Sequence, residues 1–412
     1  MTITKALPTG EVDSPYAWFR LAVSVLLCTI GGVAMWSVVV ALPSVQTEFG
    51  VARGAASLPY TLTMVGTAVG NIIIGRMVDR FGIVVPLRMA AVMLCVGYLA
   101  ASFAQNLTEF ALAQGLLMAL LGSSVTFGPL MADVSLWFVR RRGLAVSICA
   151  AGSYLSGTIW PPVVQHFIAE YGWRQTHAGL GVFCLATILP LSWFLRRSPV
   201  MTAATAQASA AKGGGRGMPG ISPGMLTALL CVAGVSCCVA MAMPQVHLVA
   251  YCADLGYGPA RGAEMLSVML VFGIVSRVGS GFVSDRIGGL RTLIVGSLAQ
   301  GVALVLYLGF DGLFSLYVVS ALFGLFQGGI VPSYALIVRE FFPAREAGAR
   351  IGLVITATMA GMALGGWMSG AIYDITGSYQ AAFLNGIGWN VLNAAIATLL
   401  LVRAGSRRLA LA

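Results

Sequence analysis

The sequence predicts an all-α membrane protein in which twelve transmembrane helices form two six-helix bundles. Three observations predict this fold: an apolar composition, twelve long apolar runs, and a polar segment that divides the runs six and six. Of the 412 residues, 58% are hydrophobic and 9% are charged, whereas a soluble domain carries roughly 25% charged residues. Because so few charges cannot cover a surface that faces water, we expect the lipid bilayer to surround the chain.

Each apolar run approaches or exceeds the length of about 20 residues that a membrane-spanning helix needs. None shows the period-two alternation of a membrane β-barrel strand. The first run is also too long for the apolar part of a cleaved signal peptide, so we expect it to remain as the first helix. The predicted spans are residues 17–43, 54–75, 85–104, 109–138, 144–169, 176–195, 222–251, 262–283, 290–309, 313–338, 348–372 and 380–402.

Residues 196–221 break the apolar pattern with Ala, Gly, Ser and Pro, a composition typical of a flexible linker. They divide the chain into an N-terminal six-helix bundle over residues 1–195, a cytoplasmic linker over residues 196–221, and a C-terminal six-helix bundle over residues 222–412. We expect this unit to act as a monomer.

The positive charges predict the orientation of the chain in the membrane. With both termini inside, all 24 Lys and Arg residues fall on the cytoplasmic side except Arg53, Arg174, Arg261 and Arg277. Cytoplasmic loops of membrane proteins carry such an excess. We therefore expect a multi-pass protein of the inner (plasma) membrane with cytoplasmic N- and C-termini. The bias accounts for the net charge of +10 without a nucleic-acid partner.

The two halves share a short motif after their second spans. Residues 75–82 read GRMVDRFG and residues 281–288 read GFVSDRIG. The shared pattern resembles the GxxxDRxG loop signature of the major facilitator superfamily, whose halves are parallel six-helix repeats. Glycine permits close helix approach, and aspartate can pair with arginine or cap a helix. We interpret the motif as a gate between the halves, formed by Gly75, Asp79, Arg80, Gly281, Asp285 and Arg286.

Arg277 is the only charged residue between Met265 and Ser284. It precedes Asp285 by eight residues, or about 12 Å along a helix, which is too deep to reach water easily. One interpretation is an ion pair with a carboxylate on a neighbouring helix, such as Asp133. We favour the other, in which a fixed cation lines a cavity between the halves, because a guanidinium matches a carboxylate in shape and charge.

A carrier that moves protons needs a group that titrates. His247, in the seventh apolar run, is one candidate because histidine titrates near physiological pH, although a lone helical histidine is more often a packing residue. Asp133 is the other, although we expect it to form a salt bridge with the cluster Arg140–Arg142. Further aromatic and polar residues could complete the cavity: Trp36, Tyr154, Gln327, Tyr334 and Asn385.

Two stretches resemble the monocarboxylate transporter family and its bacterial relatives; the oxalate/formate exchangers belong to the same wider group. WFVRRRGLAVSICAAGS followed by WPPVVQHFIAEYGWR resembles the fourth and fifth helices of that family, and residues 246–289 resemble its seventh and eighth. The resemblance implies transport of small organic monocarboxylates such as lactate or pyruvate, often with a proton. It also implies that Arg277 binds the carboxylate.

The chain departs from this family at three places. Animal members carry an Asp one turn before the helix 8 arginine, where this chain has Gly273, and a Lys on helix 1, where the match falls near Trp36. The oxalate exchangers carry a Lys in helix 11, and none occurs between Ile351 and Tyr373. The usual proton relay therefore cannot be transferred to this chain. A single fixed cation suits one carboxylate better than two, because a second charge would stay uncompensated in a low dielectric.

The sequence thus predicts a secondary transporter, not an enzyme, that moves a small organic monocarboxylate by alternating access, with proton symport preferred over anion exchange or uniport. We expect no cofactor and no metal, because the eight cysteines lack metal-ligand spacing. A drug/proton antiporter would need an acidic cavity and a Gly-Pro-rich fifth helix, which CAAGSYLSGTIWPP matches poorly. A nutrient sensor on a transporter scaffold would need a longer output segment than the tail after Leu401.

Overall fold

The computed structural model describes residues 9–10, 12–126, 128–138, 141–199, 217–218 and 220–410. These residues are almost entirely helical, which confirms the all-α class. The exceptions with regular structure are two short strands, β1 (Thr9–Gly10) and β2 (Ser198–Pro199), which pair in parallel. Most of the predicted linker, residues 200–216, lies outside the described residues, so the linker stays a prediction.

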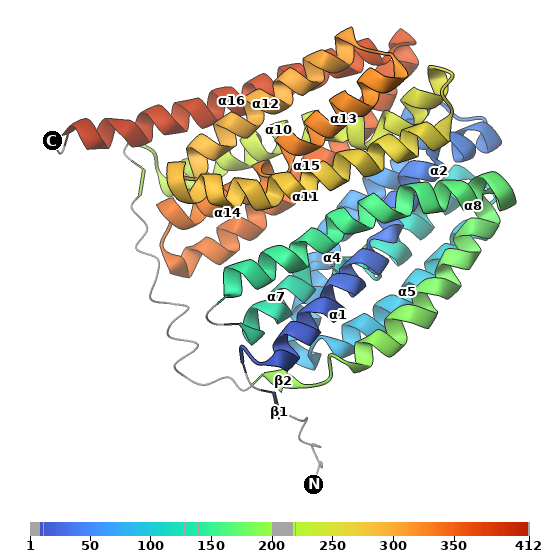
Figure 1. The fold of residues 1–412 in the computed structure, drawn as a ribbon, viewed down its shortest axis with the longest axis horizontal. Coiled ribbons are helices and arrows are strands. Elements are labelled where there is room, and N and C mark those ends of the chain that lie inside the picture. Colours follow the sequence, from blue (N-terminus) through green and yellow to red (C-terminus); the bar gives the residue numbers. More distant parts are fainter. Residues whose placement is uncertain are drawn as a thin grey trace.

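Figure 1 shows the helices in two groups that follow the order of the sequence. The first group, called the N bundle here, lies on the side of α1, α5 and α7, and the second, the C bundle, on the side of α12, α13 and α16. The N bundle comprises α1 (Pro15–Gly31), α2 (Val33–Phe49), α3 (Arg53–Ala56), α4 (Leu58–Phe81), α5 (Val84–Phe103), α6 (Leu107–Leu112), the π-helix η1 (Ala113–Leu120), the 3-10 helix η2 (Ser123–Thr126), α7 (Gly128–Trp137) and α8 (Arg142–Trp193).

The C bundle follows in the same manner after the linker. It comprises α10 (Pro223–Asp254), α11 (Pro259–Ile287), α12 (Gly289–Gly309), α13 (Leu313–Gln327), α14 (Ile330–Phe341), α15 (Ala344–Thr376) and α16 (Tyr379–Ala410).

The described residues contain 11 helical segments that are long and apolar enough to cross a membrane. The predicted number is twelve, and α8 explains the difference. It contains Gly172 in a left-handed conformation, with φ 78° and ψ 160°, which glycine adopts without steric cost. Figure 1 shows α8 as two arms that meet at this turn. Its two arms match the predicted spans 144–169 and 176–195, so the structure is consistent with twelve crossings.

Two other predicted spans are built from shorter pieces. The first is divided between α1 and α2 at Gly32. Gly50 follows the last residue of α2, Phe49, and its φ of 61° is typical of the residue after a helix C-terminus. The fourth passes from α6 through η1 and η2 to α7. A π-helical segment inside a helix is rare and occurs frequently at functional sites. In η1 the buried side chain of Gln114 donates a hydrogen bond to the carbonyl oxygen of Ala34 over 2.6 Å.

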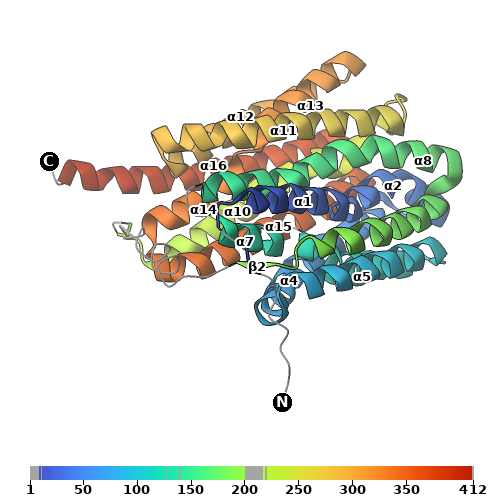
Figure 2. The same ribbon diagram turned by 60° about the horizontal axis from the view of Figure 1, so that its bottom comes forward.

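The two bundles meet along a seam that runs between them. On the N side the seam is formed by α2, α3, α4 and α8, and on the C side by α10, α11 and α15. Figure 2 shows α11 lying alongside α8. The seam is where side chains from both halves of the chain come together, and the predicted cavity is therefore sought there.

Candidate functional site

Arg277, on α11, faces α8 across the seam. Its guanidinium carbon lies 4.5 Å from the centre of the Tyr154 ring, and its Nη1 donates a long hydrogen bond of 3.4 Å to the carbonyl oxygen of Ala150. No carboxylate of the described residues pairs with Arg277, and its buried Nε has no hydrogen-bond partner there. A half-buried cation is therefore held by an aromatic ring and one carbonyl, with a donor left over.

Asp133 does not pair with Arg277, because Arg20 holds both of its oxygens. Arg20, on α1, donates from Nε to Oδ2 over 2.9 Å and from Nη2 to Oδ1 over 2.8 Å. Its guanidinium also lies 4.7 Å from the Trp137 ring centre. Asp133 therefore forms a salt bridge with Arg20, a partner that was not predicted, and pairing with the cluster Arg140–Arg142 stays a prediction. Arg20 approaches from the adjacent helix with the bidentate fork that carboxylates favour; Arg140 and the side chain of Arg142 lie outside the described residues.

Gly273 marks the position where the family's animal members carry an aspartate. A Cβ atom on Gly273 would lie 2.5 Å from Cε1 and 2.7 Å from Cδ1 of Tyr154. These distances are shorter than atoms can approach without moving, so the ring of Tyr154 fills the space of a side chain at this position. In this chain the neighbour of Arg277 at this place is therefore the aromatic ring of Tyr154 and not an aspartate.

Trp36, on α2, lies at the same seam, next to the turn of α8 that follows Tyr154. A Cβ on Gly157 of α8 would lie 2.5 Å from Cε2 and Cζ2 of the Trp36 ring. Gly157 and Tyr154 both belong to α8 and are one helical turn apart, so Trp36 contacts α8 one turn away from Tyr154. Of the predicted cavity residues, Tyr154 and Arg277 are therefore in contact, and Trp36 packs against the next turn of α8.

Gln327 ends α13, which packs against α11 beside Arg277. A Cβ on the next residue, Gly328, would lie 3.1 Å from the backbone nitrogen of Arg277. The fully buried Gln327 accepts a hydrogen bond of 2.9 Å at Oε1 from Gln245 Nε2, and its own Nε2 has no partner among the described residues. Sequence reasoning missed Gln245, although an amide inside the apolar seventh run was a visible signal.

Tyr334 and Asn385 lie elsewhere. Tyr334 is buried within the C bundle and donates to Asn393 Oδ1 over 2.8 Å. Asn385 lies with Gly388, Trp389 and Leu392 around a shallow hollow formed by α16 alone. The structure does not bring either residue to Arg277.

His247 is fully buried in α10, and both of its ring nitrogens are hydrogen-bonded. Nε2 lies 2.8 Å from the carbonyl oxygen of Gly366, and Nδ1 lies 3.2 Å from the hydroxyl oxygen of Tyr379. Because a carbonyl can only accept, we assign the proton to Nε2, so that Nδ1 accepts from Tyr379. His247 therefore belongs to a network with Tyr379, separate from the contacts of Arg277.

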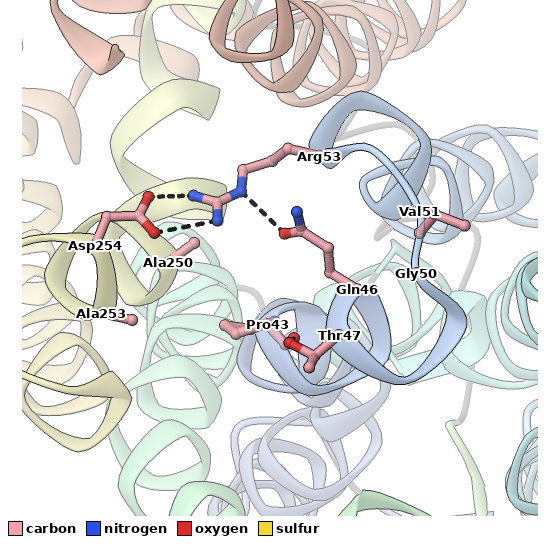
Figure 3. Close-up of a pocket in the computed structure, with 9 residues that line it drawn as sticks. All are labelled: Pro43, Gln46, Thr47, Gly50, Val51, Arg53, Ala250, Ala253 and Asp254. Atoms are coloured by element: carbon pink, nitrogen blue, oxygen red, sulfur yellow. Dashed lines mark hydrogen bonds and ion pairs between the residues drawn. The ribbon is translucent and has the colours of Figure 1, made fainter. Parts of the chain in front are cut away.

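That network continues to Arg53 at the far end of the bundles, the end formed by residues 50–53, 254–258 and 377–379. Figure 3 shows the Arg53 guanidinium between Gln46 and Asp254. Nε donates to Gln46 Oε1 over 3.0 Å, the terminal nitrogens pair with both carboxylate oxygens of Asp254, and Nη1 also donates to Tyr379 over 2.9 Å. A cavity of about 300 Å³ adjoins this cluster. Sequence reasoning placed Arg53 outside the membrane but gave it no role.

The GxxxDRxG motifs lie at the opposite end. A Cβ on Gly75 or Gly281 would meet no described atom within 4 Å, so among the described residues the close helix contact expected at these glycines is not formed. Arg80 and Arg286 are exposed, and the side chains of Asp79 and Asp285 lie outside the described part of the chain. Within the described ranges, no cluster of His, Cys, Asp and Glu could hold a metal ion.

Comparison with known proteins places these features in a family. Residues 24–305 and 225–410 match the sequence profile of the Major Facilitator Superfamily. The chain is 30% identical over 337 residues to Monocarboxylate transporter 13 of Bos taurus, covering 80% of this chain and 75% of the relative. It is 23% identical over 333 residues to the MFS-type transporter pynF of Aspergillus niger, covering 81% and 75%.

Solved structures show the same fold. The crystal structure of a bacterial homologue of the human lysosomal transporter Spinster, in an inward-facing and occupied conformation, superimposes with a TM-score of 0.71. The match covers 95% of this chain and 96% of that one at 12% sequence identity. The unoccupied inward-facing form of the same homologue gives a TM-score of 0.68.

Proposed function

Because this chain belongs to the Major Facilitator Superfamily, we propose that it carries a small organic monocarboxylate, of the lactate or pyruvate kind, across the inner membrane together with a proton. Its family and its relatives identify a multi-pass membrane transporter rather than an enzyme. The proposal includes the substrate, the coupled proton and the inner membrane. It also includes the orientation, in which the far end of the bundles faces the outside. Transport would proceed by alternating access, with the two bundles rocking around a site at the seam.

The observation that carries the proposal is the state of Arg277. A cation placed in a membrane protein without a counter-ion is costly, and such residues generally pair or mark a substrate pathway. The face of Tyr154 at 4.5 Å supplies part of the compensation, about 0.5–2 kcal/mol for a contact of this kind. A carboxylate that binds the guanidinium fork through two charge-assisted hydrogen bonds compensates more. The unpartnered Nε is available for such a ligand.

The charge balance supports a substrate with one carboxylate. Asp133 is neutralised by Arg20, and Asp254 is neutralised by Arg53. Neither carboxylate pairs with Arg277, so within the described part of the chain the Arg277 site keeps one uncompensated positive charge. A monocarboxylate would neutralise this charge, whereas a dicarboxylate would bring a second charge without a partner.

His247 is the better of the two proton-coupling candidates. Asp133 is bound on both oxygens by Arg20 inside the N bundle alone. His247 instead contacts Tyr379, which contacts Arg53 of the other bundle. A proton on Nδ1 would remove the acceptor to which Tyr379 now donates. Protonation of His247 would therefore alter the contact between Tyr379 and Arg53, which crosses the seam. The groups around His247 are the Gly366 carbonyl, Tyr379, Arg53, Asp254 and Asp374.

Uptake into proteoliposomes tests the proposal. Labelled lactate, pyruvate and a short panel of other acids would be offered with and without an inward proton gradient, to the wild type and to Arg277→Ala. Arg291→Ala, which removes an exposed arginine of α12, serves as the matched control. We expect monocarboxylate uptake that the proton gradient accelerates, lost in Arg277→Ala and kept in Arg291→Ala. Uptake that needs an opposing anion gradient and ignores the proton gradient would identify an exchanger instead.

A further inference from the structure

We propose that Arg53 is the latch of a gate at the far end of the bundles, and that opening of this end requires Arg53 to release two carboxylates of the C bundle. Arg53 belongs to α3 of the N bundle. In the C bundle, Asp254 is the last residue of α10 and Asp374 lies in the last turn of α15. The proposal concerns how the far end closes, and it does not depend on which acid is carried.

The first carboxylate binds the side chain of Arg53. Asp254 receives hydrogen bonds from both terminal nitrogens of the guanidinium. Of the six ion pairs among the described residues, this is the only one that joins the two bundles: Arg20–Asp133, His166–Glu170 and Arg174–Glu48 lie within the N bundle, and Arg261–Glu264 and Arg350–Glu346 within the C bundle. Since alternating access requires the bundles to separate at this end, this pair has to break in each cycle.

The second carboxylate binds the backbone at the same place. Asp374 accepts hydrogen bonds of 2.7 Å from the backbone nitrogens of Arg53 and Gly54. Here α3 and α15 approach so closely that a Cβ on Gly370 would lie 2.9 Å from the carbonyl oxygen of Arg53. The closed state is therefore built from backbone fit as well as charge, which gives it a defined geometry.

Two tyrosines of the C bundle complete the seat of the guanidinium. The carbon of the Arg53 guanidinium lies 4.4 Å from the Tyr373 ring centre and 5.7 Å from that of Tyr379. The Tyr379 hydroxyl accepts from Arg53 and, as assigned above, donates to Nδ1 of His247. Release of Arg53 would therefore remove one hydrogen bond from Tyr379 and alter the contact that His247 makes.

The surroundings of the latch suit a contact that opens and closes. Arg53 is 8% exposed, but the Asp254 side chain keeps 30% of its surface accessible. The lining of the adjoining cavity includes the polar side chains of Gln46 and Thr47 beside Arg53 and Asp254. Water can therefore reach Asp254 when the pair separates, so the carboxylate is not left unsolvated. The Arg20–Asp133 pair, with side chains 2% and 9% exposed inside one bundle, has no such access.

Distance measurements between spin labels test the latch directly. Labels would be placed on Gln175 of α8 and Gln380 of α16, two exposed far-end positions outside the network. Cys231→Ser would remove the native cysteine that is not fully buried. The distance distribution would be compared in the wild type, Arg53→Gln, Asp254→Asn and Asp254→Glu. Arg261→Gln, which breaks an exposed ion pair of the C bundle alone, is the matched control.

We expect Arg53→Gln and Asp254→Asn to raise the ratio of long to short distances at least about tenfold, because a charge without its partner destabilises the closed end. Asp254→Glu and Arg261→Gln are expected to stay near the wild type. Thermal unfolding identifies a variant that fails to fold, and Asp254→Asn keeps the test decisive if Arg53→Gln is lost. Wild-type distributions in both folded variants would overturn the latch. The spin-label experiment does not measure monocarboxylate uptake. Its result therefore tests the latch even if the proposed substrate is wrong.

Discussion

The ring of Tyr154 occupies the place that a side chain at Gly273 would take, and the guanidinium of Arg277 lies over the same ring at 4.5 Å. Three residues on two bundles thus form one unit: the absence of a side chain at 273 admits the ring, and the ring then supports the cation. Because Gly273 and Arg277 are one turn apart on α11 and both lie against the Tyr154 ring, a substitution at either changes the contacts of that ring.

Substitution of Gly273 tests this packing. Gly273→Ala would place a Cβ 2.5 Å from Tyr154 Cε1 and force the ring away from Arg277. Overpacking of this kind costs about 1–3 kcal/mol. We expect a higher KM for monocarboxylate uptake and a lower unfolding temperature. Gly279→Ala on the same helix meets no described atom within 4 Å, and it is expected to change neither quantity; equal effects of the two substitutions would show that the ring does not depend on Gly273.

The aromatic face of Tyr154 is expected to matter more than its hydroxyl. Tyr154→Phe keeps the ring beneath the guanidinium, whereas Tyr154→Leu keeps bulk but removes the cation–π contact. That contact contributes about 0.5–2 kcal/mol, so the two variants should differ in substrate affinity by several-fold. Binding of pyruvate to the purified protein by calorimetry measures the difference. Identical affinities in Phe and Leu variants would contradict a role for the ring face.

The ion pair of Arg20 and Asp133 is expected to stabilise the N bundle rather than to move protons. Asp133→Asn leaves the buried guanidinium of Arg20 without its charge partner, which costs about 3–5 kcal/mol in comparable pairs. We expect a lower unfolding temperature, with much of the loss recovered in Arg20→Met/Asp133→Leu. Monocarboxylate uptake by folded Asp133→Asn should still be accelerated by a proton gradient. Uptake that does not respond to the gradient would instead identify Asp133 as the coupling group.

His247 is expected to carry the coupling. In His247→Gln, the side chain can still bond Gly366 or Tyr379, but it cannot take up a proton near neutral pH. We therefore expect uptake that no longer responds to an inward proton gradient, while exchange of labelled for unlabelled substrate continues. A gradient response equal to that of the wild type would remove His247 from the coupling mechanism.

The fold was predictable because its signals are local. Apolar length predicts each crossing, and the GxxxDRxG motif occurs once in each half, so the family plan followed from short stretches of sequence. The isolation of Arg277 was also visible, since no other charge lies between Met265 and Ser284. The structure adds the ring of Tyr154, which packs against Gly273 and Arg277 of α11. These residues follow Tyr154 by 119 and 123 positions in the sequence.

The partners of the other charges were not predictable, because they depend on how the helices pack. Arg20 and Asp133 are separated by 113 positions, and Arg53 and Asp254 by 201. No periodicity within one helix indicates which distant helix it will contact. Asn385 shows the same limit for a single helix: its polarity marks it as a candidate, but only the packing of α16 places it by an outer hollow and away from the seam.

Binding of a monocarboxylate to Arg277 is most directly measured by calorimetric titration of pyruvate into the purified protein, with Arg277→Gln beside it. The protein is expected to bind pyruvate, and Arg277→Gln is expected to lose at least about tenfold in affinity while keeping the wild-type unfolding temperature, because a charge-assisted pair contributes roughly 1.5–3 kcal/mol. Arg291→Gln should bind as the wild type does. Equal pyruvate affinity in the wild type and in folded Arg277→Gln would contradict the assignment of Arg277 as the carboxylate site.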